Sequence, residues 1–185
     1  MGKKCWNCKA EVLPKDFFCK FCKKIQENVE IDEFEIFSMD KRVLINLDLL
    51  EKKHLELQMT FHPNKFISLS KKEIEISNKY SSKINEAYNT LKNNVNRINL
   101  ILMKSGVSII NHNETYKNSE LLEDIMEIQE ELMFADVDNK KKKKERIKKL
   151  IDEILLDTEE LYKKGDYNHM LYNSIRLSYL NKILN

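Results

Sequence analysis

Phe61-His62-Pro63-Asn64-Lys65-Phe66 lies between the two strongest helical runs of this chain. It follows a run of helix-favouring residues from Leu47 to Phe61 and precedes a second helical run that opens at Ser70. Proline lacks a backbone N–H and fixes φ, so a helix that starts at Leu47 must end near Pro63. Ser70 and Glu73 have the spacing of a capping box, which begins the next helix. The pattern predicts two helices joined by a short loop that presents a His-Pro-Asn tip.

Two helices joined by so short a loop pack antiparallel, and both runs carry a stripe suited to that contact. In the first run the stripe residues recur at helical spacing, namely Leu50, His54, Leu57 and Phe61. The second run carries Ile74, Tyr80, Ile84, Ala87, Tyr88 and Leu91. Phe34 and Phe37 predict a short helix laid against a larger element, and a further helix is expected from Val95 to Lys104.

Composition favours an all-α fold and argues against nucleic-acid binding. The 185 residues include only three Gly and two Pro, which argues against a turn-rich β fold. The net charge of +2, from 32 basic and 30 acidic residues, gives no overall signature of nucleic-acid binding. The local exception is Lys140 to Lys144, which is expected to be a solvated segment.

The ends and motifs of the sequence give three further expectations. No apolar stretch approaches the length of about 18 residues needed to span a bilayer. No secretory signal or Arg-rich transit segment is recognisable, which predicts an intracellular, reducing compartment. No nucleophile–base set, Gly-rich phosphate loop or His-Glu-x-x-His pattern occurs, so the sequence does not predict an enzyme.

The four cysteines of the chain form two Cys-x-x-Cys pairs, Cys5/Cys8 and Cys19/Cys22. Each pair can supply two thiolates from one turn, and two such knuckles close a tetrahedral structural zinc site. Two disulfides or a thiolate-bound iron–sulfur cluster are the alternatives, of which a reducing compartment disfavours the first. The aromatic residues nearby are expected to cover the knuckles, namely Trp6, Phe17, Phe18 and Phe21.

The segment after Gly106 predicts an antiparallel three-helix bundle over residues 119–185, after a polar linker at 106–118. The first helix, about Ser119 to Phe134, has a core stripe at Leu121, Ile125, Ile128 and Leu132. A second apolar stripe lies beside it, at Leu122, Met126 and Met133. Surplus apolar surface of this kind indicates either a partner or extra core contacts. The second helix runs from the lysine run to Lys164, and Asp166 caps the third.

Three segments together resemble the J-domain of HscB-type (Jac-type) co-chaperones, which serve iron–sulfur cluster biogenesis. They are Phe34-x-x-Phe37, the helix that ends in Phe61-His62-Pro63-Asn64, and Ile84-Asn85-Glu86-Ala87-Tyr88. The Cys-Trp-x-Cys…Cys-x-x-Cys module in front is similar to the eukaryotic branch of that family. The resemblance implies a metal module at 1–27, a J-domain at 28–105 and the bundle at 119–185 as the scaffold-binding part.

The resemblance also implies partners and site residues. A DnaK-type chaperone would be engaged through His62, Pro63 and Asn64, with Lys53 and Lys65 as charge partners. The apolar positions that contact an IscU-type scaffold correspond to Leu122, Met126 and Tyr179. The family implies a mitochondrion or a reduced mitochondrial relic, whereas the absence of a recognisable transit segment leaves the cytoplasm open.

The sequence departs from the family pattern at two places near the tip. Asn64 replaces the aspartate of the family tripeptide, and Met59-Thr60 stands where the family usually has a basic residue. An Asx-type turn at Asn64 would keep the loop shape, whereas loss of the charge would weaken stimulation of the chaperone ATPase. The rival functions are a general J-domain co-chaperone for unfolded clients and a metal or cluster carrier that uses the four thiolates.

Overall fold

A computed structural model describes residues 3–13, 16–27, 31–109 and 119–184, the side chains of 119 and 120 excepted. The chain divides into two compact units, one formed by residues 1–40 and 46–92 and the other by 41–45 and 93–185. The predicted all-α class is confirmed, since the described elements are helical apart from two paired strands of two residues each in the cysteine module. No helix in the described part combines the length and apolarity needed to cross a bilayer.

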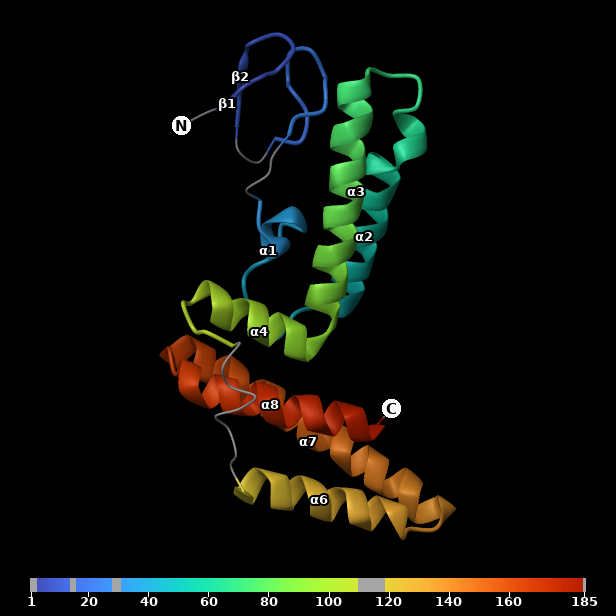
Figure 1. Cartoon of the computed structure of the whole chain (residues 1–185), viewed down its shortest axis with the longest axis vertical. Coiled ribbons are helices and arrows are strands. Elements are labelled where there is room, and N and C mark those ends of the chain that lie inside the picture. Colours follow the sequence, from blue (N-terminus) through green and yellow to red (C-terminus); the bar gives the residue numbers. More distant parts are fainter. Residues whose placement is uncertain (1–2, 14–15, 28–30, 110–118, 185) are drawn as a thin grey trace. The chain divides into compact units, whose positions relative to one another are not determined.

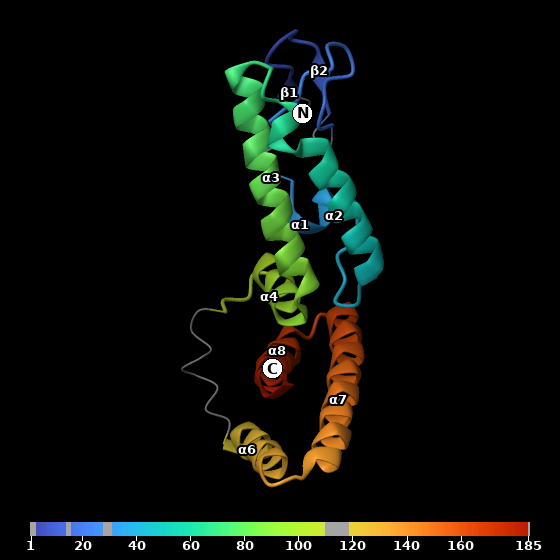
Figure 2. The same ribbon diagram turned by 90° about the vertical axis from the view of Figure 1, so that its right-hand side faces the viewer.

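Helices α2 (Leu47–Phe61) and α3 (Lys71–Lys92) form the antiparallel pair that the sequence predicts, and they lie side by side in Figures 1 and 2. Asn46 caps α2 by accepting the Leu49 N–H at 2.9 Å. The Ser70–Glu73 capping box is present, because the Ser70 N–H donates to the Glu73 carboxylate and the Glu73 N–H donates to Ser70 Oγ. Local signals therefore define both ends of the loop.

A short helix, α1 (Glu33–Ile36), packs against α3 as predicted. Its capping box is formed by Asp32, whose carboxylate accepts from the N–H groups of Phe34 and Glu35. Phe34 and Phe37 are fully buried in this unit. The cysteine module precedes α1 and contains the strands β1 (Lys3–Lys4) and β2 (Glu11–Val12), which pair antiparallel.

The second unit contains α4 (Asn94–Lys104), α6 (Ser119–Met133), α7 (Val137–Lys164) and α8 (Tyr167–Leu184). Helix α8 packs against α7, α4 and α6, so α4 joins the helices of the C-terminal bundle. We predicted α4 as the end of the J-domain segment, whereas the second structural unit already includes residues from 93 onward. The functional division into 28–105 and 119–185 stays a prediction. The predicted linker falls mostly on residues 110–118, outside the described part.

Helix α7 begins at Val137, ahead of the lysine run, and ends at Gly165, which adopts the left-handed conformation with φ of 75°. Asp136 caps its start by accepting the Asn139 N–H at 2.8 Å. The lysine run therefore lies in the first turns of a helix. Lys143 within it pairs with Glu131 of α6 at 2.8 Å.

Residues 41–45 belong to the second unit because buried charges hold them there. The Glu159 carboxylate on α7 accepts from the N–H groups of Val43 at 2.8 Å and Leu44 at 3.1 Å. Arg97 on α4 donates through Nε to the Val43 carbonyl at 2.7 Å. Both charged side chains are buried, so these backbone contacts satisfy groups that would otherwise be costly to desolvate.

Candidate functional site

The His-Pro-Asn tip is an exposed turn of 3₁₀ helix, η1 (Pro63–Lys65), between α2 and α3. His62 caps it, because its Nδ1 accepts the Asn64 N–H at 3.3 Å and its carbonyl accepts the Lys65 N–H at 2.9 Å. Among the described residues the Asn64 side chain has no hydrogen bond, so the Asx-type turn is not what shapes the loop. His62, Asn64 and Lys65 are exposed, and Phe61 and Phe66 anchor the turn from inside.

The two lysines predicted as charge partners are placed differently. Lys65 is exposed on η1, next to the tip. Lys53 donates through Nζ to the carbonyls of Phe37 at 2.7 Å and Ser38 at 2.9 Å, at the end of α1. Its ammonium therefore holds α1 against α2. The predicted contact of Lys53 with a chaperone therefore requires these two hydrogen bonds to break, so that the ammonium can pair with the chaperone instead.

The four cysteine sulfurs converge to within 4.8 Å of one another, as the paired spacing predicts. Cys5 Sγ lies 3.5 Å from Cys22 Sγ, and Cys8 Sγ lies 3.6 Å from Cys19 Sγ. A disulfide requires about 2.05 Å, whereas sulfurs at tetrahedral positions 2.3 Å from a zinc ion are roughly 3.8 Å apart. The donor set and its spacing therefore fit a thiolate-bound metal ion and do not match two disulfides.

The two knuckles have the same backbone design. The Lys9 N–H donates to the Cys5 carbonyl at 3.0 Å, and the Lys23 N–H donates to the Cys19 carbonyl at 2.9 Å. Lys9 and Lys23 have φ values of 65° and 61°, in the left-handed region that favours glycine. Each non-glycine residue there costs about 1 kcal/mol, which a bound metal ion would offset.

Hydrogen bonds to sulfur divide the thiols into acidic and basic members. Burial raises the pKa of Cys5, but the N–H groups of Cys8 and Asn7 bring that pKa down to about 6. The Lys24 N–H lowers the pKa of Cys22. The Ala10 N–H lowers the pKa of Cys8, but burial and the neighbouring thiols raise it to about 11. A cation bound by all four would displace the remaining protons, so its affinity falls as the pH falls.

The aromatic residues of the module serve a purpose that differs from the prediction. Phe17 and Phe18 pack against Phe61 on α2, the residue that precedes the tip. Trp6 donates through Nε1 to the Ile25 carbonyl at 2.7 Å, and Phe21 is 75% exposed. The prediction that all of them cover the knuckles is therefore wrong for Phe21, which is largely exposed to solvent, and incomplete for Phe17 and Phe18, which also pack against α2.

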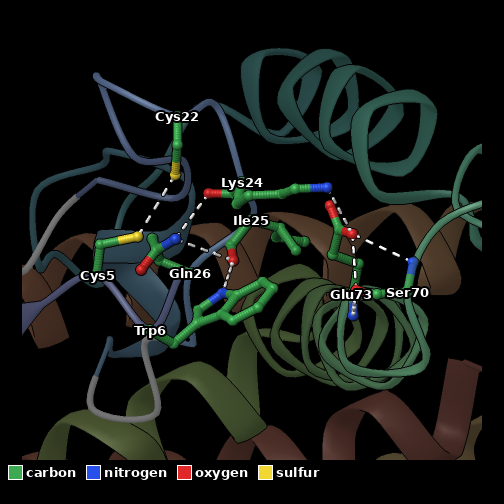
Figure 3. Close-up of polar contacts among 8 residues, drawn as sticks. All are labelled: Cys5, Trp6, Cys22, Lys24, Ile25, Gln26, Ser70 and Glu73. Atoms are coloured by element: carbon green, nitrogen blue, oxygen red, sulfur yellow. Dashed lines mark hydrogen bonds and ion pairs between the residues drawn. The ribbon is translucent and has the colours of Figure 1, made fainter. Parts of the chain in front are cut away.

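Lys24 and Glu73 were missed as a pair by sequence reasoning. Lys24 Nζ lies 2.9 Å from Glu73 Oε2, an oxygen that also accepts from the Ser70 N–H and hydroxyl (Figure 3). Glu73 had already been assigned to the capping box, and nothing in the sequence separation of 49 residues indicates a second partner. One indication of this contact is present in the sequence, namely that the capping residue Glu73 follows closely after the loop that carries the tip.

The candidate scaffold surface lies on the second unit. Leu121 and Ile125 of α6 are buried, whereas Leu122 is 38% exposed and Met126 is 58% exposed. Met133 at the end of α6, Phe134 in the following turn and Val137 at the start of α7 are also exposed. Tyr179 is half-buried on α8, with Lys182 Nζ 5.6 Å from the centre of its ring. The second stripe of α6 is therefore surface rather than core.

The C-terminal part of the chain is similar to a known domain. The family model described as the HSCB C-terminal oligomerisation domain matches residues 117–185. An Arabidopsis thaliana protein named iron-sulfur cluster co-chaperone protein HscB homolog is 36% identical over 138 residues, which is 73% of this chain and 53% of that protein. The human iron-sulfur cluster co-chaperone protein HscB is 29% identical over 150 residues, 79% of this chain and 64% of the relative. The chain thus spans less than two thirds of either protein.

Two solved structures are similar in fold. The crystal structure of human co-chaperone protein HscB covers 98% of this chain and 94% of its own, with a TM-score of 0.86 and 25% identity. The Jac1 co-chaperone from Saccharomyces cerevisiae covers 83% of this chain and 92% of its own, with a TM-score of 0.65 and 19% identity. The second likeness concerns the fold alone. The first extends over the cysteine module, the hairpin and the C-terminal helices.

Proposed function

The chain belongs to the HscB family, and from that premise we propose that it is a co-chaperone of iron–sulfur cluster assembly. It would bind an IscU-type scaffold and deliver it to a DnaK-type chaperone, whose ATPase it would stimulate. The observation that carries the proposal is the exposed His62-Pro63 turn at the end of an antiparallel hairpin. The chain would act as an adaptor and would catalyse no reaction itself.

The chaperone contact is proposed for the tip and its surroundings. His62, Pro63, Asn64 and Lys65 form one exposed turn that a partner can reach without rearrangement of the hairpin. Next to it, Met59 is 62% exposed at the position where a basic residue is usual in the family. The contact in this chain would therefore depend more on apolar surface and less on charge than in its relatives, and would be less sensitive to salt.

The scaffold contact is proposed for the exposed side of α6, at Leu122 and Met126, with Tyr179 on α8. Support comes from the exposure of these two apolar side chains, one helical turn apart, beside a stripe of α6 that is already buried at Leu121 and Ile125. Side chains of this kind supply most of the binding energy when a partner removes them from water.

We propose that the four thiolates hold one structural zinc ion. Four cysteines leave no open coordination position, which suits a structural site rather than a catalytic one. Metal analysis and ultraviolet–visible absorption of the purified chain separate the alternatives. One zinc per chain without visible absorption is expected, whereas sulfur-to-iron charge-transfer bands would overturn the assignment. By its relatives, the compartment would be a mitochondrion or a mitochondrial relic.

A reconstituted ATPase assay tests the function. It contains the DnaK-type chaperone and the IscU-type scaffold of the same organism, with wild-type chain or His62→Gln. Stimulation of single-turnover hydrolysis by the wild type, increased by the scaffold and lost in His62→Gln, is expected. A chemically denatured protein replaces the scaffold in the matched arm. Equal stimulation by that protein would identify a general co-chaperone for unfolded clients instead.

A further inference from the structure

The cysteine module holds both ends of the loop that carries the tip. The loop runs from His62 to Leu69, so its ends are fixed by Phe61, the last residue of α2, and by Ser70, which caps α3. Residues from the module contact the structure at each of these two points. Between these two points Phe66 is buried and hydrogen bonds within the loop close its turn, whereas most of the other loop residues are exposed to solvent.

At the first end, Phe61 is enclosed by aromatic rings from the module. The ring of Phe18 stacks on it with an interplanar angle of 6° and a centroid distance of 5.6 Å, and Phe17 meets it edge-on at 5.1 Å. Tyr80 of α3 completes the cluster at 4.7 Å, and its hydroxyl donates to the Gln26 carbonyl of the module at 2.9 Å. Phe61 is 1% exposed as a result.

At the second end, Lys24 reaches the cap of α3. One carboxylate oxygen of Glu73 receives Lys24 Nζ at 2.9 Å, the Ser70 hydroxyl at 2.7 Å and the Ser70 N–H at 3.2 Å (Figure 3). The Glu73 side chain is 4% exposed, so without a cation its charge would be buried and unpaired. Lys24 therefore stabilises the ionised cap that fixes where the loop ends.

These contacts depend on the metal site for their position. The buried cluster around the thiols consists of Cys5, Cys19 and Val12, with Ala10 and Cys22 packed against it, which is too little apolar surface to fold without a metal ion. Lys24 lies two residues after Cys22, and its carbonyl accepts the Cys19 N–H at 2.9 Å. Release of the thiolates would therefore free Lys24 from the knuckle.

We propose that metal occupancy of the four thiolates sets the conformation of the loop from His62 to Leu69, with Lys24 and Phe18 as positioning residues. The part of this inference that concerns ATPase stimulation rests on the proposed function, and the part that concerns the loop does not. The metal module is then a brace: an unmetallated chain retains the helical hairpin but presents its tip in a mobile form. Delivery to the chaperone would be limited to chains that carry the metal ion.

Amide hydrogen exchange read by mass spectrometry tests the brace on the full chain without any chaperone. The chain is compared as the zinc-loaded form, after removal of zinc with a chelator, and after addition of zinc chloride. Exchange in the peptide that spans residues 62–69 is expected to be about tenfold faster without zinc, with recovery on re-addition. Equal exchange in all three samples would overturn the proposal.

Lys24→Met separates the brace from general unfolding, because all four metal ligands remain. With zinc bound, this variant is expected to speed exchange of residues 62–69 about tenfold while the centre of α3 is unchanged. The matched control is Lys20→Met, since Lys20 pairs within the module, with Asp16 at 3.4 Å. A loop as protected in Lys24→Met as in Lys20→Met would overturn the role of Lys24, even if chelation loosens the whole hairpin.

The ATPase assay then provides the second readout. Zinc-loaded Lys24→Met is expected to stimulate less than Lys20→Met, and the zinc-free chain less than either. If the loop loosens as expected but no form of the chain stimulates, the proposed co-chaperone activity fails and the brace stands. If all forms stimulate equally while the loop loosens, the loop is braced but the brace does not control activity.

Discussion

Among single residues, Asn64 is the tip position at which the sequence departs from the J-domain tripeptide that it resembles. Its side chain is exposed and the turn is closed by His62, so a change of charge there leaves the loop shape intact. Asn64→Asp is expected to raise ATPase stimulation, because a carboxylate forms a charge-assisted contact worth about 2–5 kcal/mol when its partner is desolvated. The unfolding free energy should change by less than about 0.5 kcal/mol.

The measurement is a titration of single-turnover ATPase rate against chain concentration. A shift of the half-maximal concentration by about tenfold or more to lower values is expected for Asn64→Asp. Ser68→Asp, at another exposed position of the same loop, adds the same negative charge and is the matched control for net charge. Identical curves for the wild type and Asn64→Asp would mean that the cognate chaperone has adapted to the amide.

Glu73 gives a prediction for pH. Burial raises the pKa of this carboxyl, but the Lys24 ammonium and the Ser70 hydroxyl and N–H bring it below its ordinary value of 4.5. A carboxyl whose pKa is lower in the folded state stabilises the fold at neutral pH, and that contribution is lost as the pH falls through the lowered value. Glu73→Gln should therefore cost about 1–3 kcal/mol at pH 7 and progressively less below pH 4.5.

Urea unfolding of wild type and Glu73→Gln in excess zinc, repeated from pH 7 downward, measures this difference. Metal analysis at each pH separates protonation of Glu73 from release of Lys24 on metal loss, so the difference between the two zinc-loaded chains reports on Glu73. Glu75→Gln is the matched control, since Glu75 pairs with Lys79 at an exposed site and should matter little at any pH. A constant difference between wild type and Glu73→Gln across the range would contradict the ionised cap.

At the scale of elements, α6 separates core from surface within two adjacent residues. Leu121 is 2% exposed and Leu122 is 38% exposed, so the same substitution tests two roles. Leu121→Ala is expected to cost about 2–5 kcal/mol of unfolding free energy. Leu122→Ala with Met126→Ala should cost less than about 1 kcal/mol and should weaken binding of the IscU-type scaffold. Calorimetry of scaffold binding together with the melting temperature of each variant distinguishes a core role from a contact role. A large stability loss in the double variant would place Leu122 and Met126 in the core.

The same scale explains which elements were predictable. Helix ends such as Phe61, Ser70 and Gly165 depend on local chemistry, since proline, capping residues and glycine act within one turn. The paired spacing of the four cysteines likewise predicts the convergence of their sulfurs without knowledge of the rest of the chain. The packing of α4 against α8 was missed. Helix α4 could pack against the helices before it or those after it, and the apolar pattern of the sequence does not distinguish the two.

The long-range polar contacts were equally out of reach. Glu159 and Arg97 hold Val43 from positions more than fifty residues away, and each reads in the sequence as an ordinary charge on a helix. Lys24 reads in the sequence as an ordinary charged residue just after the last cysteine. Such contacts depend on where the chain returns in space, which amphipathic periodicity does not specify.

At the scale of the whole molecule, the two units should unfold separately, because their stabilising features do not overlap. All four cysteines, the proposed metal ligands, belong to the unit that contains helices α2 and α3, whereas the Glu159 carboxylate that holds Val43 and Leu44 belongs to the other. Metal binding adds to the folding free energy only of the unit that holds the metal. Scanning calorimetry of the zinc-loaded chain is therefore expected to resolve two transitions.

Two perturbations assign them. Removal of zinc should lower the transition of the first unit and leave the other in place. Glu159→Gln should lower the other by about 5 °C or more, because loss of the charge weakens two buried hydrogen bonds by about 1–3 kcal/mol and a unit of this size loses several degrees per kcal/mol. Glu160→Gln is the control, since Glu160 pairs with Lys163 at an exposed site. A single transition moved by both perturbations would show that the units fold as one, and the metal module would then stabilise the C-terminal helices as well as the loop.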